Sequence, residues 1–149
     1  MLVDNLKTLL ATSYSFSVKT ANSHWNIEGG DFPQYHEFLG EVYADIYDQV
    51  DKIAEYSRTL EAYVPASLSV FKADSIVTDQ DSALSDPYTI FKNLLDDNAK
   101  FIDLLNETFD NATAERQQGI ANYIAERLDA HQKLQWKVRS ILKNNNVDD

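Results

Sequence analysis

The stretch that decides the fold is EAYVPASLSVFKADSIVTDQDSALSD, residues 61–86, the longest part of the chain without a continuous helical pattern. Pro65 and the many Ser, Asp and Thr residues predict a connection, and SLSVFK, residues 67–72, predicts a short helix within it. Connections of this length are uncommon in a compact domain, where they cross from one end of the fold to the other or carry function. We therefore expect a crossover, and the helical patterns on its two sides then determine the fold.

Two long helical patterns precede this crossover. Residues 4–27 carry apolar side chains at spacings of three and four, and Gly29 or Gly30 can end that helix in the left-handed conformation. Asp31 is expected to cap the second helix, which extends to about residue 60 and is long enough to favour a bundle. The expected core positions are Leu6, Leu9, Leu10, Tyr14, Val18 and Ala21 in the first helix, and Tyr35, Leu39, Val42, Ile46, Val50 and Ile53 in the second.

Two more helical patterns follow the crossover. Asp86 and Pro87 suit the N-cap and first turn of the third helix. FDNATAE, residues 109–115, is expected to end it, with Asn111 or Thr113 as the next cap, and the last helix is expected to fray over Asn144 to Asn146. The expected core positions here are Ile90, Phe91, Leu94, Leu95, Ile102, Leu104 and Leu105, then Ile120, Tyr123, Ile124, Leu128, Leu134, Trp136, Val138 and Ile141.

This order of elements predicts the fold class. Two antiparallel helical pairs joined by one long link are typical of ferritin-like bundles, whereas a plain up-down bundle needs no such link. The chain of 149 residues is of the size of one domain. We therefore predict an all-α, ferritin-like four-helix bundle with a long crossover containing a short helix, as a single domain over residues 1–149.

Composition excludes several classes of function. The chain has no cysteine, which excludes disulfides, thiol catalysis and zinc–thiolate sites, so any metal must use nitrogen and oxygen ligands. No apolar run is long enough to span a bilayer and no signal peptide is evident, so we expect a cytoplasmic protein without a membrane partner. The net charge of −11 attracts cations, and neither terminus is basic, so direct DNA binding is not expected.

A second stripe on the predicted second helix carries the residues suited to chemistry. Asp51 and Glu55 are one turn apart, so their carboxylates can converge in a way that suits Fe(II) or another first-row divalent ion. His36 lies fifteen residues before Asp51, or roughly 22 Å along a helix, so one helix cannot bring both to one ion. The complete stripe is His36, Gly40, Tyr43, Tyr47, Asp51 and Glu55.

Two antiparallel copies of this helix can complete the site. If a two-fold axis passes near Tyr43, His36 of one chain faces Asp51 of the other, and the symmetry generates two identical sites. His24, at the end of the first helix, would join His36 from the same chain, and Gly40 would allow the backbones to approach closely. The alternative is that the acidic pair is a solvated helix face and that both histidines are hydrogen-bonded structural residues.

The other conspicuous side chains are expected to have structural roles. His131 has no acidic residue on a shared stripe, so we expect it to be structural. The tyrosines of the second helix are expected to pack in an interface, and Trp25 and Trp136 are expected to be packing residues.

The segment HWNIEGGDFPQYHEFLGEVYADIYDQVDKIAE, residues 24–55, resembles the signature of the Dps family, the mini-ferritins. The shared features are His-Trp at the end of the first helix, a glycine-containing turn, Phe and His early in the second helix, and Asp-x-x-x-Glu further along. VPASLSVFKADSIV, residues 64–77, resembles the crossover of that family, and ERLDAHQKLQWKVRSIL, residues 126–142, resembles its last helix. The match over HWNIEGGDF and YHEF is especially close to Dps-like proteins that phages carry.

The resemblance implies a hollow homo-dodecamer built from two-fold dimers, with iron as the metal. Ferroxidase centres would lie at the dimer interfaces, with His24 and His36 from one subunit and Asp51 and Glu55 from the other. They would oxidise Fe(II) with hydrogen peroxide or O2 and store Fe(III) mineral, which protects against oxidative damage. The expected location is the cytoplasm of a bacterium or a phage-infected cell, with association with a virion as the alternative.

The sequence departs from the family pattern at two places. Gly40 stands where the family usually has an Asp, so two carboxylates remain instead of three and we expect a weakened ferroxidase. The alternative is a cage with a degenerate site, which binds zinc or another divalent metal, or serves as a structural shell or virion component. The second departure is the missing lysine-rich tail, which again argues against direct DNA binding.

Overall fold

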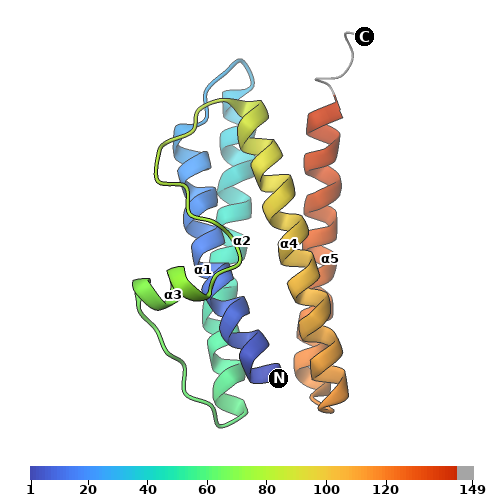
Figure 1. Ribbon diagram of the computed structural model, residues 1–149. Coiled ribbons are helices and arrows are strands. Elements are labelled where there is room, and N and C mark those ends of the chain that lie inside the picture. Colours follow the sequence, from blue (N-terminus) through green and yellow to red (C-terminus); the bar gives the residue numbers. More distant parts are fainter. Residues whose placement is uncertain (144–149) are drawn as a thin grey trace.

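The computed structural model describes residues 1–143 and is a helical bundle with a long crossover (Figure 1). Its helices are α1 (Leu2–Asn26), α2 (Phe32–Thr59), α3 (Leu68–Asp74), α4 (Pro87–Ala114) and α5 (Gln118–Lys143). The pairs α1/α2 and α4/α5 are antiparallel, and the crossover returns from the end of α2 to the start of α4, with α3 packed on α1. The described part of the chain contains no strand, which confirms the all-α prediction, and the two antiparallel pairs joined by a long crossover confirm the predicted bundle.

Two sequence predictions concern features beyond this architecture. The expected fraying at Asn144 to Asn146 lies outside the described residues. Between residues 1 and 143, no helix combines the length and the apolarity that crossing a bilayer would require.

The ends of the helices follow largely from local side chains. The Oδ2 atom of Asp86 accepts a hydrogen bond from the Thr89 N–H at 2.8 Å, so Asp86 caps α4 as predicted, and this bond lowers the pKa of the Asp86 carboxyl. Ser67 caps the short helix α3 in the same way. Gly29 has a φ of +133° in the turn between α1 and α2, a conformation that L side chains rarely adopt. Asp31 holds the N-cap position of α2, but its side chain makes no capping hydrogen bond.

The predicted break at residues 109–115 was wrong by several residues, because α4 continues to Ala114. Neither Asn111 nor Thr113 caps α5. The amide of Asn111 instead donates a hydrogen bond to the side chain of Asn5 in α1. An Asn side chain serves equally well as a cap or as a link between helices, and the sequence does not distinguish these two uses.

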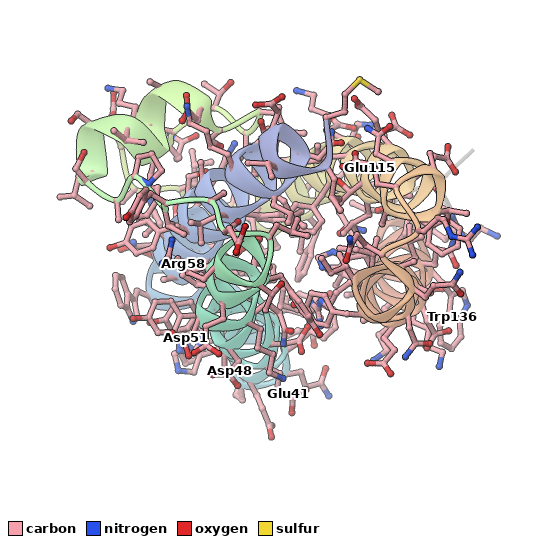
Figure 2. All side chains as sticks on the ribbon, turned by 90° about the horizontal axis from the view of Figure 1, so that it is seen from below. Glu41, Asp48, Asp51, Arg58, Glu115 and Trp136 are labelled. Atoms are coloured by element: carbon pink, nitrogen blue, oxygen red, sulfur yellow. The ribbon has the colours of Figure 1, made fainter. Side chains whose placement is uncertain are left out.

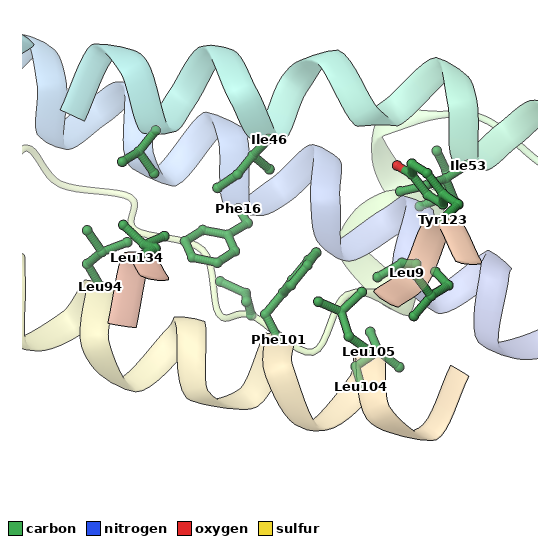
Figure 3. Close-up of a cluster of buried hydrophobic side chains, with 14 of the residues drawn as sticks. Leu9, Phe16, Ile46, Ile53, Leu94, Phe101, Leu104, Leu105, Tyr123 and Leu134 are labelled. Carbon is green, nitrogen blue, oxygen red and sulfur yellow. The ribbon is translucent and has the colours of Figure 1, made fainter. Parts of the chain in front are cut away.

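Apolar side chains from the four long helices form one continuous core (Figure 3). Phe16 of α1, Ile46 of α2, Leu105 of α4 and Ile124 of α5 are all at most 1% exposed. The rings of Phe16 and Phe101 meet edge to face with centroids 5.6 Å apart. The inward faces of the helices, including α2, are therefore held in place by packing, and only the outward faces are free to bind.

Two residues of the expected core stripes are exposed. Val18 is 54% and Trp136 58% exposed, so their prediction as core residues was wrong. Trp25, which was expected to be a packing residue, is 66% exposed in the single chain. The apolar stripe of each helix is wider than the face that its neighbours cover, and side chains at the margin point past them. Figure 2 shows Trp136 on the outward side of α5.

A buried polar network centred on His131 connects α2, α4 and α5. The Nδ1 atom of His131 donates to Asn98 Oδ1 at 2.7 Å, and its Nε2 atom accepts from Arg127 Nη2 at 3.0 Å. Arg127 also binds both carboxylate oxygens of Asp45 on α2, at 3.2 and 2.8 Å. Burial and the positive charge of Arg127 lower the pKa of His131 to about 3, so the ring is neutral and structural, as expected.

This network predicts a loss of stability in mild acid. The unfolded chain gains a proton at His131 below its usual pKa of 6.5, whereas the folded chain does not until about pH 3. The free energy of unfolding should therefore fall by about 1.4 kcal/mol per pH unit below that pKa, or about 2 kcal/mol by about pH 5. Urea titrations at several pH values measure this slope, which His131→Gln should lose and the control His24→Gln should keep. Equal slopes in the wild type and His131→Gln would contradict it.

Candidate metal centre

The four predicted ligands form two pairs near opposite ends of α2. His24 and His36 lie where α1 ends and α2 begins, and Asp51 and Glu55 lie near the end of α2. Figure 2 shows Asp51 on the outward surface of α2. Among residues 1–143 of one chain, no three His, Asp or Glu side chains converge in a way that could hold a metal ion. A single chain therefore offers two half-sites and no complete one.

Reciprocal hydrogen bonds fix the two imidazoles. The Nδ1 atom of His24 lies 2.6 Å from the carbonyl oxygen of His36, and the Nδ1 atom of His36 lies 2.6 Å from the carbonyl oxygen of His24. Because a carbonyl oxygen can only accept, both Nδ1 atoms must carry the proton. In the neutral rings, both Nε2 lone pairs are therefore free for a metal, which is the arrangement that metal-binding histidines require.

Stacking restricts the imidazoles further. The rings of His24 and His36 are nearly parallel, with centroids 3.9 Å apart and an angle of 12°. Phe32, in the first turn of α2, stacks on His36 with centroids 5.0 Å apart. Each Nδ1 is directed toward the backbone of the other residue, so the Nε2 atoms are directed away from it. The histidine half-site is thus organised before any ion binds.

The carboxylate half-site shows the mutual influence of its two members. A hydrogen bond with Asp51, together with the negative charge of Asp51, raises the pKa of the Glu55 carboxyl. Residues one turn apart on a helix face the same way, so the two carboxyl groups lie on one side of α2. A cation that binds between them would remove their mutual repulsion.

The flank of α2 between the two half-sites is aromatic. The rings of Tyr43 and Tyr47 have centroids 6.2 Å apart, and Tyr47 is 51% exposed. An exposed aromatic strip between two incomplete half-sites suits packing against another protein surface.

Comparison with known proteins assigns the family. The model of the ferritin-like domain family matches residues 3–146. The chain is 32% identical over 106 residues to the DNA protection during starvation protein of Halobacterium salinarum, covering 71% of this chain and 57% of that protein. It is 27% identical over 137 residues to the protein of the same name from Helicobacter pylori, covering 92% of this chain and 95% of that protein.

A solved structure shows the same architecture. Antigen TpF1 from Treponema pallidum superposes with a TM-score of 0.92 at 25% identity, covering 95% of this chain and 91% of that one. The chain belongs to the Dps branch of the ferritin-like family.

Within this Dps-family chain, the structure brings His24 to His36 and Asp51 to Glu55. It does not bring the two pairs together in one subunit, and the role of the four residues as ligands stays a prediction. The contact of Phe32 with His36 was not predicted, although the spacing of four residues between them on one helix was a usable signal.

The acidic pair predicts a specific change in titration. Asp51→Asn removes the neighbouring negative charge, so the pKa of Glu55 should fall toward its ordinary value. A pH titration of the Glu55 carboxyl carbon by NMR in the metal-free protein measures this. Asp48→Asn removes an equal charge two turns from Glu55 and serves as the control. An equal fall in both variants would show that net charge, and not the pairing, sets the pKa.

Proposed function

We propose that two chains pair through the outward flanks of α2, antiparallel about a two-fold axis, and form two identical iron-oxidising sites. His24 and His36 of one chain would face the partner's Asp51 and the partner's Glu55. The observation that carries this proposal is the separation of a nitrogen pair, at the junction of α1 and α2, from an oxygen pair near the end of α2. Neither pair is a complete site, and an antiparallel copy supplies to each the ligands that it lacks.

The donor set favours iron as the substrate. Two imidazole nitrogens and two carboxylates, without thiolates, match the ligands that Fe(II) accepts. The names of the starvation-protection relatives and the membership of the ferritin-like family support a protective role that involves iron. We propose that the ferric product is stored as mineral inside a hollow dodecamer of such dimers.

The stacked imidazoles favour two irons in each site. A metal bound to imidazole lies in the plane of the ring, along the Nε2 lone pair. The planes of His24 and His36 are nearly parallel at a centroid separation of 3.9 Å, so one ion cannot lie in both planes. Two ions, one for each ring, would satisfy both imidazoles, as in two-metal sites.

A two-iron site fits the electron balance of peroxide. Two Fe(II) ions give one electron each to one hydrogen peroxide, its O–O bond breaks, and two protons complete two water molecules. Hydrolysis of the two Fe(III) ions then gives the mineral. O2 is the alternative oxidant, and its full reduction to two water molecules takes four electrons and four protons, and therefore four Fe(II) ions.

Complementation between two defective chains tests the shared site. His24→Ala/His36→Ala and Asp51→Ala/Glu55→Ala should each form little ferric mineral from Fe(II) and peroxide. When they are co-expressed in equal amounts, each mixed dimer regains one intact site, so about a quarter of the wild-type activity should return. Absorbance of the soluble ferric mineral measures the rate.

A matched control completes this experiment. Co-expression of His24→Ala/His36→Ala with the chain carrying all four substitutions leaves no intact site, so no activity should return. Recovery in this control, or activity no higher than the sum of the two variants alone, would sink the shared-site proposal.

The absence of a carboxylate at Gly40 favours one alternative function. A site with two carboxylates instead of three could bind iron without oxidising it, as part of a metal-binding shell. Anaerobic calorimetry with Fe(II), followed by addition of peroxide, separates the two functions. We expect binding followed by oxidation faster than in the Asp51→Ala/Glu55→Ala variant, whereas binding without faster oxidation would favour the shell.

A further inference from the structure

Gly40 lies in the interior of α2, where glycine is a poor choice. Glycine destabilises a helix relative to alanine, because it loses more conformational freedom on folding. Its backbone does not require it, since Gly29 is the only glycine among the described residues with a positive φ. Some interaction other than backbone conformation must therefore account for a glycine at this position.

The ring of His24 occupies the space that a side chain at position 40 would need. A Cβ atom there would lie 2.7 Å from Cε1 of His24 and 3.1 Å from its Nδ1. Contacts of this kind force the neighbour to move. By contrast, a Cβ atom at Gly119, near the start of α5, meets nothing within 4 Å. The two helical glycines thus differ in this one respect.

His24 has little freedom to move aside. One face of its ring stacks on His36, and its Nδ1 atom is held by the carbonyl oxygen of His36 at 2.6 Å. A side chain at position 40 would displace the ring from the stack and weaken the hydrogen bond that fixes its tautomer. The stack on His36 and the hydrogen bond of Nδ1 together direct Nε2 of His24 outward. Both depend on the absence of a side chain at position 40.

We propose that Gly40 is a positioning residue, whose missing side chain seats the imidazole of His24 against α2 and so organises the histidine half-site. Its consequence for metal binding rests on the proposed function. The seating itself is a property of the metal-free chain and can be tested separately.

A competing explanation comes from the proposed dimer. If His36 faces the partner's Asp51, the same antiparallel register places Gly40 opposite the partner's Tyr47. Gly40 would then leave room for the partner subunit and not for His24. The two explanations predict different results when His24 is removed.

A double-mutant cycle in the metal-free protein decides between them. The variants are Gly40→Ala, His24→Ala and their combination, with Gly119→Ala as the matched control, and the readout is the thermal midpoint. Gly119→Ala should raise the midpoint through helix propensity. Gly40→Ala should lower it or leave it unchanged in the wild type, but should raise it in the His24→Ala background, where the seat is empty.

Two outcomes of this cycle would overturn the proposal. If Gly40→Ala raised the thermal midpoint of the wild type as Gly119→Ala does, the position of the His24 ring would not depend on a glycine at position 40. A lower thermal midpoint with Gly40→Ala in both the wild type and His24→Ala would show that Gly40 leaves room for the partner subunit and not for His24.

Metal binding gives a second readout that a purely structural role would not change. Co(II) absorbs in the visible range when bound and is not oxidised under anaerobic conditions, so it reports the site without turnover. Gly40→Ala should weaken Co(II) binding about tenfold, the lower end of the effect of residues that orient ligands, and should have no further effect in His24→Ala. Unchanged affinity in Gly40→Ala would overturn the positioning role. If the wild type binds no Co(II) but the double-mutant cycle gives the expected thermal midpoints, Gly40 positions His24 and the proposed function is wrong.

Discussion

The distance between the two half-sites of α2 is the constraint on which the proposed chemistry depends. Fifteen residues of unbroken helix separate His36 from Asp51, or roughly 22 Å, and no rotation of side chains closes that distance. In the proposed site, the length of the helix therefore makes assembly a condition of tight metal binding. A monomer could hold an ion only weakly at either end, so oxidation of Fe(II) would be confined to the assembled protein.

This constraint has meaning only because the bundle holds α2 rigid. Ile46 and Ile53 anchor its inward face in the core, and the ion pair between Asp45 and Arg127 connects it to α5. The hydroxyl of Tyr123 adds a hydrogen bond to Gln49 at 2.7 Å. The buried side of the helix thus carries the stability, and on the opposite flank Tyr47, Asp51 and Glu55 are exposed and open to contacts outside the single chain.

Sequence patterns predicted the fold well because helical periodicity and the long crossover are local signals. They failed where one residue type has two uses, as at Asn111, and at the margins of the apolar stripes, as at Val18 and Trp136. The half-sites were predictable as spacings along the chain. The tautomers and stacking of the imidazoles were not, because they depend on how the turn between α1 and α2 places His24 over His36, a relation between two helices that periodicity does not contain.

Gly40 stands where the family resemblance leads us to expect a carboxylate, and in the proposed site its effect goes beyond a missing ligand. The Coulomb attraction between a carboxylate and an ion scales with the charge of the ion. Removing one carboxylate from a site therefore costs Fe(III) about 1.5 times as much attraction as it costs Fe(II). In the proposed site, the ferric product would lose more than the ferrous substrate, which favours transfer of iron from the site to the mineral. On the proposed role of Gly40, the space at this position also lets the two imidazoles stack in a fixed geometry. Order in the nitrogen half-site would thus offset the missing negative charge.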